Sequence, residues 1–192
     1  MTKLSVLLAS ASPRRQELLA QIGVCFNTTA PEIDEIPFPG EDPMDYVVRL
    51  AKEKARAGQK DNSDQIPVLG ADTIVVVDNE ILGKPQNKTH GIAMLRRLSG
   101  RSHRVLSAVC LDVKTKQRCQ LSESKVHFRP MSEDEIIAYW QTGEPADKAG
   151  AYAIQGKGAI FIKRIEGSYS GVMGLPLFET AILLQQAGIQ IL

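Results

Sequence analysis

One aspartate stands inside an otherwise apolar part of the chain. Asp72 belongs to the segment Gly70-Ala71-Asp72-Thr73, within the apolar run of residues 68–77. Burying a carboxylate costs free energy unless it is paired, hydrogen-bonded or coordinated. Neighbouring backbone N–H groups could satisfy it, or it could bind a metal or take a proton from water. We predict that Asp72 has this second, chemical role.

A second cluster, Ser10-Ala11-Ser12-Pro13-Arg14-Arg15, stands where an apolar segment ends and a helix is expected to begin. Free backbone N–H groups and the positive end of the helix dipole favour a phosphate at such a position. Two hydroxyls, from Ser10 and Ser12, and two guanidinium groups, from Arg14 and Arg15, add further donors. The alternative is that Ser12 only caps the helix and both arginines are solvated. The cluster indicates phosphate binding.

Other charged residues complete an inventory for phosphoryl chemistry. Glu32, Asp34 and Glu35 lie in a proline-rich segment, where acids are usually solvated, but beside a phosphate such a carboxylate can hold Mg²⁺ or Mn²⁺. Lys84 stands in a Gly-Lys-Pro turn that follows a predicted strand pair. Four residues are weaker candidates, because lysines are usually on the surface and a glutamine can simply complete a turn: Lys52, Lys54, Lys148 and Gln155.

Several common enzyme classes are excluded by missing motifs. The chain has no G-x-x-x-x-G-K-[ST] phosphate loop, no G-x-G-x-x-G after a strand, no H-E-x-x-H and no G-x-S-x-G. His90, His103 and His127 are isolated in the sequence. What remains is a set of cations for phosphates, carboxylates for a divalent metal and one acid to activate water.

Composition limits the class of protein and its partners. The 192 residues carry 23 Lys+Arg against 22 Asp+Glu, and this net charge of +1 argues against sequence-independent binding of a nucleic-acid polymer. The length predicts a single domain over residues 1–192, with room for two lobes around a central cleft. No apolar stretch approaches the roughly 18 residues that a membrane span needs.

Three cysteines, Cys25, Cys110 and Cys119, are an odd number, lie far apart and include no C-x-x-C pair. This pattern argues against both a disulfide framework and a thiolate zinc site. The opening apolar run is interrupted by Ser5 and is shorter than the roughly 7–15 residues of a signal-peptide core. We therefore predict a reducing, cytoplasmic compartment.

Helix caps, turn residues and apolar periodicity predict alternating strands and helices, and so an α/β fold. Because tight hairpins occur beside helical crossovers, the sheet should be mixed. The predicted strands cover residues 4–9, 24–30, 66–77, 81–82, 103–113, 118–129, 159–165 and 189–192, with 114–117 as a connection. The predicted helices cover residues 13–22, 43–58, 87–98, 133–142 and 176–187.

The order and spacing of these motifs resemble the Maf family, and within it the YhdE-type branch. The matching segments cover nearly the whole chain: Ser10-Ala11-Ser12-Pro13-Arg14-Arg15, Asp34-Glu35, Lys52-Glu53-Lys54-Ala55, Gly70-Ala71-Asp72-Thr73, Gly83-Lys84-Pro85, Asp147-Lys148-Ala149-Gly150-Ala151-Tyr152, Ile154-Gln155-Gly156, Gly174-Leu175-Pro176-Leu177 and Glu179-Thr180. Each motif is weak alone, but the set is specific.

This resemblance implies an elongated mixed-sheet α/β fold, similar to the inosine triphosphate pyrophosphatases. It also implies a cytoplasmic, metal-dependent nucleoside triphosphate pyrophosphatase that cleaves between the α- and β-phosphates, and family members are often homodimers. By residue-to-residue transfer, Asp72 is the proton acceptor. An arginine, a threonine and a glutamine associated with a preference for dTTP and UTP fall on Arg14, Thr73 and Gln155.

The residues and the resemblance together suggest a mechanism. We expect the triphosphate to be held by Ser10, Arg15, Lys54 and Lys84, together with the N–H groups of the first helix. Glu35, with Asp72 close by, should position Mg²⁺ or Mn²⁺, and which of the two carboxylates contacts the metal stays open. Two other functions also stay open: a nucleotide-sensing regulator of cell division that binds without turnover, and a hydrolase of modified purine triphosphates.

Overall fold

A mixed sheet organises the molecule. The computed structural model describes residues 6–60, 62, 66–113 and 116–191. Within this part of the chain seven strands form one sheet, in the order β2-β1-β3-β5-β6-β7, with β4 paired to β3. β1 runs parallel to β2 and β3, and the other pairs are antiparallel, so the predicted mixed sheet is confirmed. The strands are β1 Val6–Ala9, β2 Phe26–Thr29, β3 Val68–Val77, β4 Glu80–Leu82, β5 Ser102–Val113, β6 Lys116–Phe128 and β7 Ile162–Glu166.

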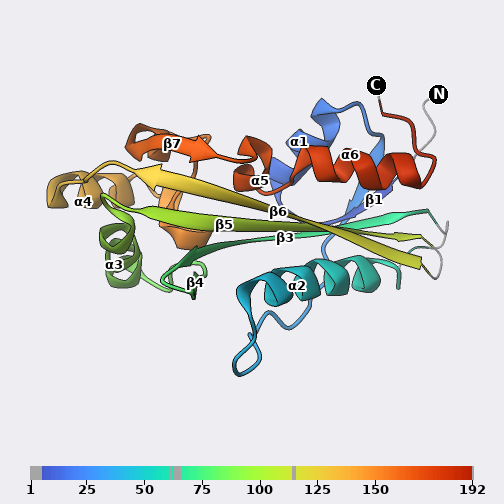
Figure 1. Ribbon diagram of the computed structural model, residues 1–192, viewed down its shortest axis with the longest axis horizontal. Helices are drawn as coiled ribbons and strands as arrows, with labels where there is room; N and C mark the ends of the chain where they lie inside the picture. Colours follow the sequence, from blue (N-terminus) through green and yellow to red (C-terminus); the bar gives the residue numbers. More distant parts are fainter. Residues whose placement is uncertain (1–5, 61, 63–65, 114–115, 192) are drawn as a thin grey trace.

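Helices cover both faces of this sheet (Figure 1). α2 packs on one face, whereas α1 and α6 pack on the other face. α3 and α4 cover the far end of the long strands. The α-helices are α1 Pro13–Gln21, α2 Pro43–Gly58, α3 Lys88–Leu98, α4 Glu133–Gln141, α5 Tyr169–Met173 and α6 Leu177–Gln186, and the short 3-10 turns are η1 Glu144–Asp147, η2 Ala149–Ala151 and η3 Lys157–Phe161. None of the helices among the described residues combines the length and apolar character needed to cross a bilayer.

The central strand β3 changes neighbours along its length. On one edge it pairs with β5 from Val68 to Val76. On the other edge it pairs with β1 through Val68 and Leu69, and with β4 from residue 75 onward. Asp72 lies in the interval between these two pairings, at the point where this edge of β3 faces the space between β1 and β4.

Close packing of α2 on β3 depends on Gly70. A Cβ added at Gly70 would lie 2.3 Å from the carbonyl oxygen of Ala51 and 2.5 Å from the backbone nitrogen of Ala55. Backbone atoms of a helix cannot move aside as the end of a side chain can. The absence of a side chain at Gly70 therefore sets how near α2 can lie to the strand that carries Asp72.

Several element boundaries differ from the sequence prediction. The segment expected to begin a strand at residue 159 is instead η3, and β7 begins at Ile162. The short helix α5 was not predicted. No strand is formed by residues 189–191, and Leu192 lies outside the described residues. Residues 4–5 of the first predicted strand and residues 114–115 of the predicted connection also lie outside them.

The expectation of no disulfide was wrong, because Cys110 and Cys119 are bonded to each other across β5 and β6. The predicted four-residue connection at 114–117 would place Cys110 opposite Leu121. In the structure Val113 pairs with Lys116 instead, and this register brings Cys119 opposite Cys110. The expectation rested on the number and spacing of the cysteines, which do not say which side chains face each other; the register of the two strands does.

Gly70→Ala should reduce stability because it inserts a methyl group against the backbone of α2. We expect the free energy of unfolding to fall by about 1–3 kcal/mol, the usual cost of overpacking. Urea unfolding followed by circular dichroism measures this change. Gly83→Ala is the matched control, because a Cβ at Gly83 meets no atom within 4 Å. Equal stability of the two variants would contradict the packing role of Gly70.

Candidate active site

A cleft of about 790 Å³ opens where the edge of β3 lies between β1 and β4. Its walls come from the β1–α1 turn, the segment before α2, helix α2, strand β3, the turn after β4 and the segments at 147–155 and 172–174. Most of the candidate residues that the sequence suggested line it: Ser10, Ser12, Arg14, Arg15, Glu35, Lys54, Asp72, Thr73, Lys84, Lys148 and Gln155. The acids Glu32 and Asp34 do not. The structure thus gathers these side chains, while their individual roles stay predictions.

Asp72 is paired with a cation in the wall of this cleft. Its side chain comes from β3 and the residue is only 7% exposed. Oδ1 of Asp72 accepts a hydrogen bond of 2.6 Å from Nζ of Lys54. Burial raises the pKa of Asp72 above its ordinary value, while the charges of Lys54 and Arg15 act in the opposite direction. The result is a carboxylate that is more basic than a solvated aspartate.

Lys54 also reaches a second carboxylate. Its Nζ lies 2.7 Å from Oε1 of Glu35, so one ammonium group bridges Glu35 and Asp72. Burial disfavours ionisation of Glu35, but the hydrogen bond and charge of Lys54 outweigh it and lower the pKa of Glu35. The pKa values of the two carboxyls shift in opposite directions because the Glu35 side chain is 53% exposed, whereas that of Asp72 is 10% exposed.

Helix α2 sets the position of Lys54. Asp42 caps this helix by accepting a hydrogen bond from the backbone of Met44, and Pro43 occupies the first turn. Tyr46 and Lys54 are eight residues apart and lie on the same side of the helix, because every fourth residue repeats a face. The hydroxyl of Tyr46 donates a 2.7 Å hydrogen bond to the carbonyl oxygen of Glu35. One helix therefore holds both the backbone and the carboxylate of Glu35.

Arg15, in the first turn of α1, forms hydrogen bonds with residues from the N-terminal and the C-terminal parts of the chain. NH1 of Arg15 donates to Oγ of Ser10 at 3.3 Å, and Nε of Arg15 donates to the carbonyl oxygen of Gly174 at 2.8 Å. Burial lowers the pKa of Arg15, although the guanidinium stays protonated at neutral pH. Ser12 stands at the N-cap of α1, but its side chain makes no capping hydrogen bond. The alternative that Ser12 only caps the helix is therefore wrong.

Thr73 points to the face of the sheet opposite Asp72. Oγ1 of Thr73 lies 2.9 Å from Oγ of Ser107 and donates to the carbonyl oxygen of Gly174 at 3.3 Å. Ser107 in turn donates to the carbonyl oxygen of Gly171 at 2.6 Å. These bonds attach α5 to the sheet beside the cleft, so the unpredicted helix forms part of the site.

The remaining cations come from the far wall of the cleft. Lys84 is exposed at the turn after β4, and the carbonyl oxygen of Gly83 accepts a hydrogen bond of 3.1 Å from the nitrogen of Gly150. This bond joins the Lys84 turn to the segment that carries Lys148, which is paired with Asp147, and Gln155. Of the weaker candidates, Lys52 does not line the cleft.

Two residues of the site were missed by sequence reasoning. Tyr46 is not among the candidates that the sequence suggested, yet it lines the cleft and its hydroxyl binds the backbone of Glu35. Ser107 is 1% exposed within the apolar strand β5. A buried polar residue in an apolar run is the same signal that identified Asp72, and it would have identified Ser107.

A divalent metal would need ligands from the substrate, in addition to protein side chains, to bind here. Among the described residues, no group of three or more His, Cys, Asp or Glu side chains is arranged to hold a metal ion. Glu35 and Asp72 do converge on a common cation, the ammonium of Lys54. Magnesium in nucleotide sites is usually held by one or two carboxylates, with substrate phosphates and water as further ligands. These two carboxylates fit that pattern.

Comparison with known proteins gives one consistent result. Residues 5–187 match the family model described as "Maf-like protein". A protein of Alkalilimnicola ehrlichii named dTTP/UTP pyrophosphatase is 53% identical, covering 94% of this chain and 92% of its own length. One of Methylococcus capsulatus with the same name is 52% identical, covering 97% and 92%. A solved dITP/XTP pyrophosphatase of Mycobacterium abscessus aligns at 17% identity with a TM-score of 0.46, covering 95% of this chain and 94% of that one.

Lys54→Met should destabilise the protein in a pH-dependent way. Without the cation, the folded-state pKa of Asp72 rises further above its unfolded value, so the free energy of unfolding falls as the pH rises between the two values. We expect a loss of about 1–3 kcal/mol near neutral pH, as for a buried group left without its partner. The loss should shrink as the pH approaches the ordinary pKa of aspartate. Urea unfolding at neutral and mildly acidic pH measures it.

The double variant Lys54→Met/Asp72→Asn is the matched control, because no buried aspartate is then left to be charged. Its stability should show little of the pH-dependent loss. A loss of the same size in the double variant would mean that Lys54 stabilises the fold through its other contacts, such as the one with Glu35, and not through Asp72.

Proposed function

Because this chain belongs to the Maf family, we propose that it hydrolyses dTTP and UTP to the nucleoside monophosphate and pyrophosphate. Curated relatives at 53% and 52% identity over nearly the whole chain carry the name dTTP/UTP pyrophosphatase. One observation carries the mechanism: the buried Asp72 carboxylate and the Lys54 ammonium meet in a cation-lined cleft. A base and a phosphate-binding group then act on the same substrate.

The cations of the cleft hold the triphosphate. Arg15 is fixed by Ser10 and Gly174 before substrate arrives, so its remaining guanidinium N–H groups are oriented in advance. Lys84 approaches from the opposite wall, and the first N–H groups of α1 add further donors. Donors that are already positioned lose little entropy when the substrate binds.

Asp72 acts as the base. A water molecule attacks the α-phosphorus, forming a new P–O bond while the bond from that phosphorus to the bridging oxygen breaks. The proton of the water passes to the Asp72 carboxylate, and pyrophosphate leaves with the bridging oxygen. Because burial raises the pKa of Asp72, it accepts a proton more readily than a solvated aspartate, while Lys54 keeps it ionised.

A divalent cation is part of this proposal. Glu35 and Asp72 would hold it, and a bound Mg²⁺ or Mn²⁺ supplies positive charge that offsets the charge of the phosphates. Lys54 contacts both carboxylates and keeps their oxygens together in the absence of that ion.

Arg14, Thr73 and Gln155 read the base. All three line the cleft, and they come from α1, β3 and the segment after η2. Guanidinium, hydroxyl and amide groups can together match the donors and acceptors on a pyrimidine edge. A cytoplasmic location and a homodimer remain predictions that rest on the family resemblance.

Asp72→Asn should abolish most turnover without unfolding the protein. We expect kcat for dTTP to fall by about 10²–10⁴-fold, the usual contribution of a positioned base. Stability should be kept, because the change removes a buried charge. Asp112→Asn is the matched control, since Asp112 is also a buried aspartate with a raised pKa but does not line the cleft. Ordinary turnover by Asp72→Asn would refute the assigned role.

A screen of nucleoside triphosphates, with and without Mg²⁺ or Mn²⁺, tests the reaction itself. We expect pyrophosphate and the monophosphate from dTTP and UTP in the presence of metal. Release of orthophosphate alone would exclude cleavage between the α- and β-phosphates. Binding without turnover would favour a nucleotide-sensing regulator, and a preference for modified purine triphosphates would favour the other hydrolase class.

Substitutions at Arg14 and Gln155 should change base selectivity more than they slow the reaction. We expect Arg14→Ala and Gln155→Ala to alter the ratio of kcat/KM between UTP and other triphosphates by about 10-fold, the effect of losing hydrogen bonds to a base edge. Gln16→Ala is the control, because Gln16 is next to Arg15 on α1 but does not line the cleft. Uniform losses for every base would contradict base reading.

A further inference from the structure

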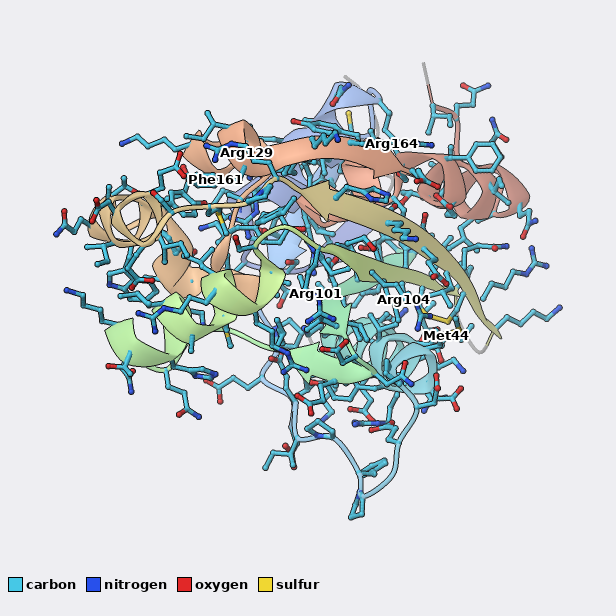
Figure 2. The ribbon with its side chains drawn as sticks, turned by 60° about the vertical axis from the view of Figure 1, so that its left-hand side comes forward. Met44, Arg101, Arg104, Arg129, Phe161 and Arg164 are labelled. Atoms are coloured by element: carbon cyan, nitrogen blue, oxygen red, sulfur yellow. A yellow bond between two sulfur atoms is a disulfide. The ribbon has the colours of Figure 1, made fainter. Side chains whose placement is uncertain are left out.

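The segment that carries Glu35 extends far from the sheet. We call residues 30–42, between β2 and α2, the Glu35 loop. Figures 1 and 2 both show it projecting beyond α2. Ile36 is 70% exposed and Phe38 is 59% exposed, so the apolar core does not hold its tip. Beyond the contacts that Glu35 itself makes with Tyr46 and Lys54, a polar contact must hold this part of the loop.

Arg49 supplies that contact from the side of α2. Its Nε and NH2 donate to the two carboxylate oxygens of Glu41 at 2.7 and 2.8 Å. NH2 also donates to the carbonyl oxygen of Ile36 at 3.1 Å, and the guanidinium carbon lies 4.0 Å from the centre of the Phe38 ring. One side chain thus holds the loop at three points that follow Glu35 in the sequence.

These contacts are more buried than those of an ordinary surface ion pair. The side chain of Glu41 is 9% exposed and that of Arg49 is 17% exposed. A bidentate arginine–carboxylate contact combined with stacking on an aromatic ring fixes the orientation of the guanidinium as well as its distance from the loop. Arg49 itself does not line the cleft, so it can influence the chemistry only through the residues that it holds.

The geometry of α2 links this anchor to the site. Arg49 binds the carbonyl of Ile36, the residue directly after Glu35, while Tyr46 binds the carbonyl of Glu35 itself. Lys54, further along the same helix, receives the Glu35 carboxylate. Two successive backbone carbonyl groups, those of Glu35 and Ile36, are therefore attached to the helix that carries the partner of the Glu35 carboxylate.

Building on the proposed function, we propose that Arg49 is a positioning residue for Glu35. It holds the Glu35 loop against α2 so that the Glu35 carboxylate meets Lys54 and the substrate phosphates. Arg49 makes no contact with substrate. Its loss should therefore act through Glu35 alone.

Arg49→Ala tests the proposal in two independent ways. We expect kcat/KM for dTTP to fall by about 10-fold, as when a residue that orients a ligating side chain is lost. We also expect faster hydrogen–deuterium exchange in residues 33–42, with exchange in β3 unchanged. Arg49→Lys should show a smaller loss of kcat/KM, because lysine keeps the charge but cannot form a bidentate contact with Glu41.

A double-mutant cycle with Glu35→Gln separates positioning from general destabilisation. If Arg49 acts through Glu35, adding Arg49→Ala to Glu35→Gln should change kcat/KM by no more than about twofold. Arg104→Ala is the matched control, because Arg104 on β5 (Figure 2) also binds a glutamate, Glu123, with two prongs and does not line the cleft. It should leave both turnover and loop exchange unchanged.

Two results would overturn the proposal. One is an equal loss of kcat/KM from Arg49→Ala in the presence and absence of the Glu35 carboxylate. The other is unchanged exchange of the Glu35 loop in both Arg49 variants. Failure of the proposed function would look different: the unsubstituted protein would not hydrolyse dTTP or UTP, while loop exchange in the Arg49 variants would still report on the anchor.

Discussion

The contact between Asp72 and Lys54 is the interaction on which the rest of the structure depends. A carboxylate that is 7% exposed in a central strand costs free energy unless it is paired or hydrogen-bonded, and Lys54 provides a hydrogen-bonded cation at 2.6 Å. That cation belongs to α2, so the helix must pack tightly on β3. Gly70 permits this approach because it places no side chain between the two backbones. Close packing of a helix on a strand therefore occurs two residues from Asp72.

The edge of β3 explains why the cleft lies where it does. β1 and β4 pair with different parts of this edge, and Asp72 and Thr73 fall between the two pairings. Successive residues of a strand point to opposite faces. One short piece of β3 thus contributes Asp72 toward α2 and Thr73 toward α5. Arg15 and Gly174 then join the two ends of the chain across the same opening.

Much of the fold could be predicted because its strands and caps have strong local signals. Two such signals are the polar residues Asp78 and Asn79, which form the hairpin turn between β3 and β4, and Ser132 with Glu135, which form a capping box at the start of α4. The register of β5 against β6 was not predictable in the same way. A connection longer or shorter by two residues leaves the same side chains of each strand on the same face, so the sequence pattern does not distinguish the two registers. The expectation of no disulfide rested on the odd number and spacing of the cysteines, which carry no information on this register, and it was therefore wrong for Cys110 and Cys119.

The candidate site was predictable where a residue conflicts with its surroundings, as Asp72 does within an apolar strand. Arg49 gave no such signal, because an arginine on a helix is ordinary and its partners Glu41 and Phe38 lie in an irregular segment. Contacts of this kind depend on the path of a loop, which local sequence does not determine. Helix α5 was missed because its five residues are too few to show a helical period.

The residues of the cleft come from separate elements, and this separation has an evolutionary consequence. Lys54 and the anchor of the Glu35 loop share one rigid helix, whereas Arg14 and Gln155 belong to α1 and to the segment after η2. Exchanging the latter residues leaves the packing of α2 on β3 untouched. Under the proposed function, descendants of such a scaffold can acquire new nucleotide preferences by a few substitutions, while the residues proposed to break the anhydride bond are inherited intact.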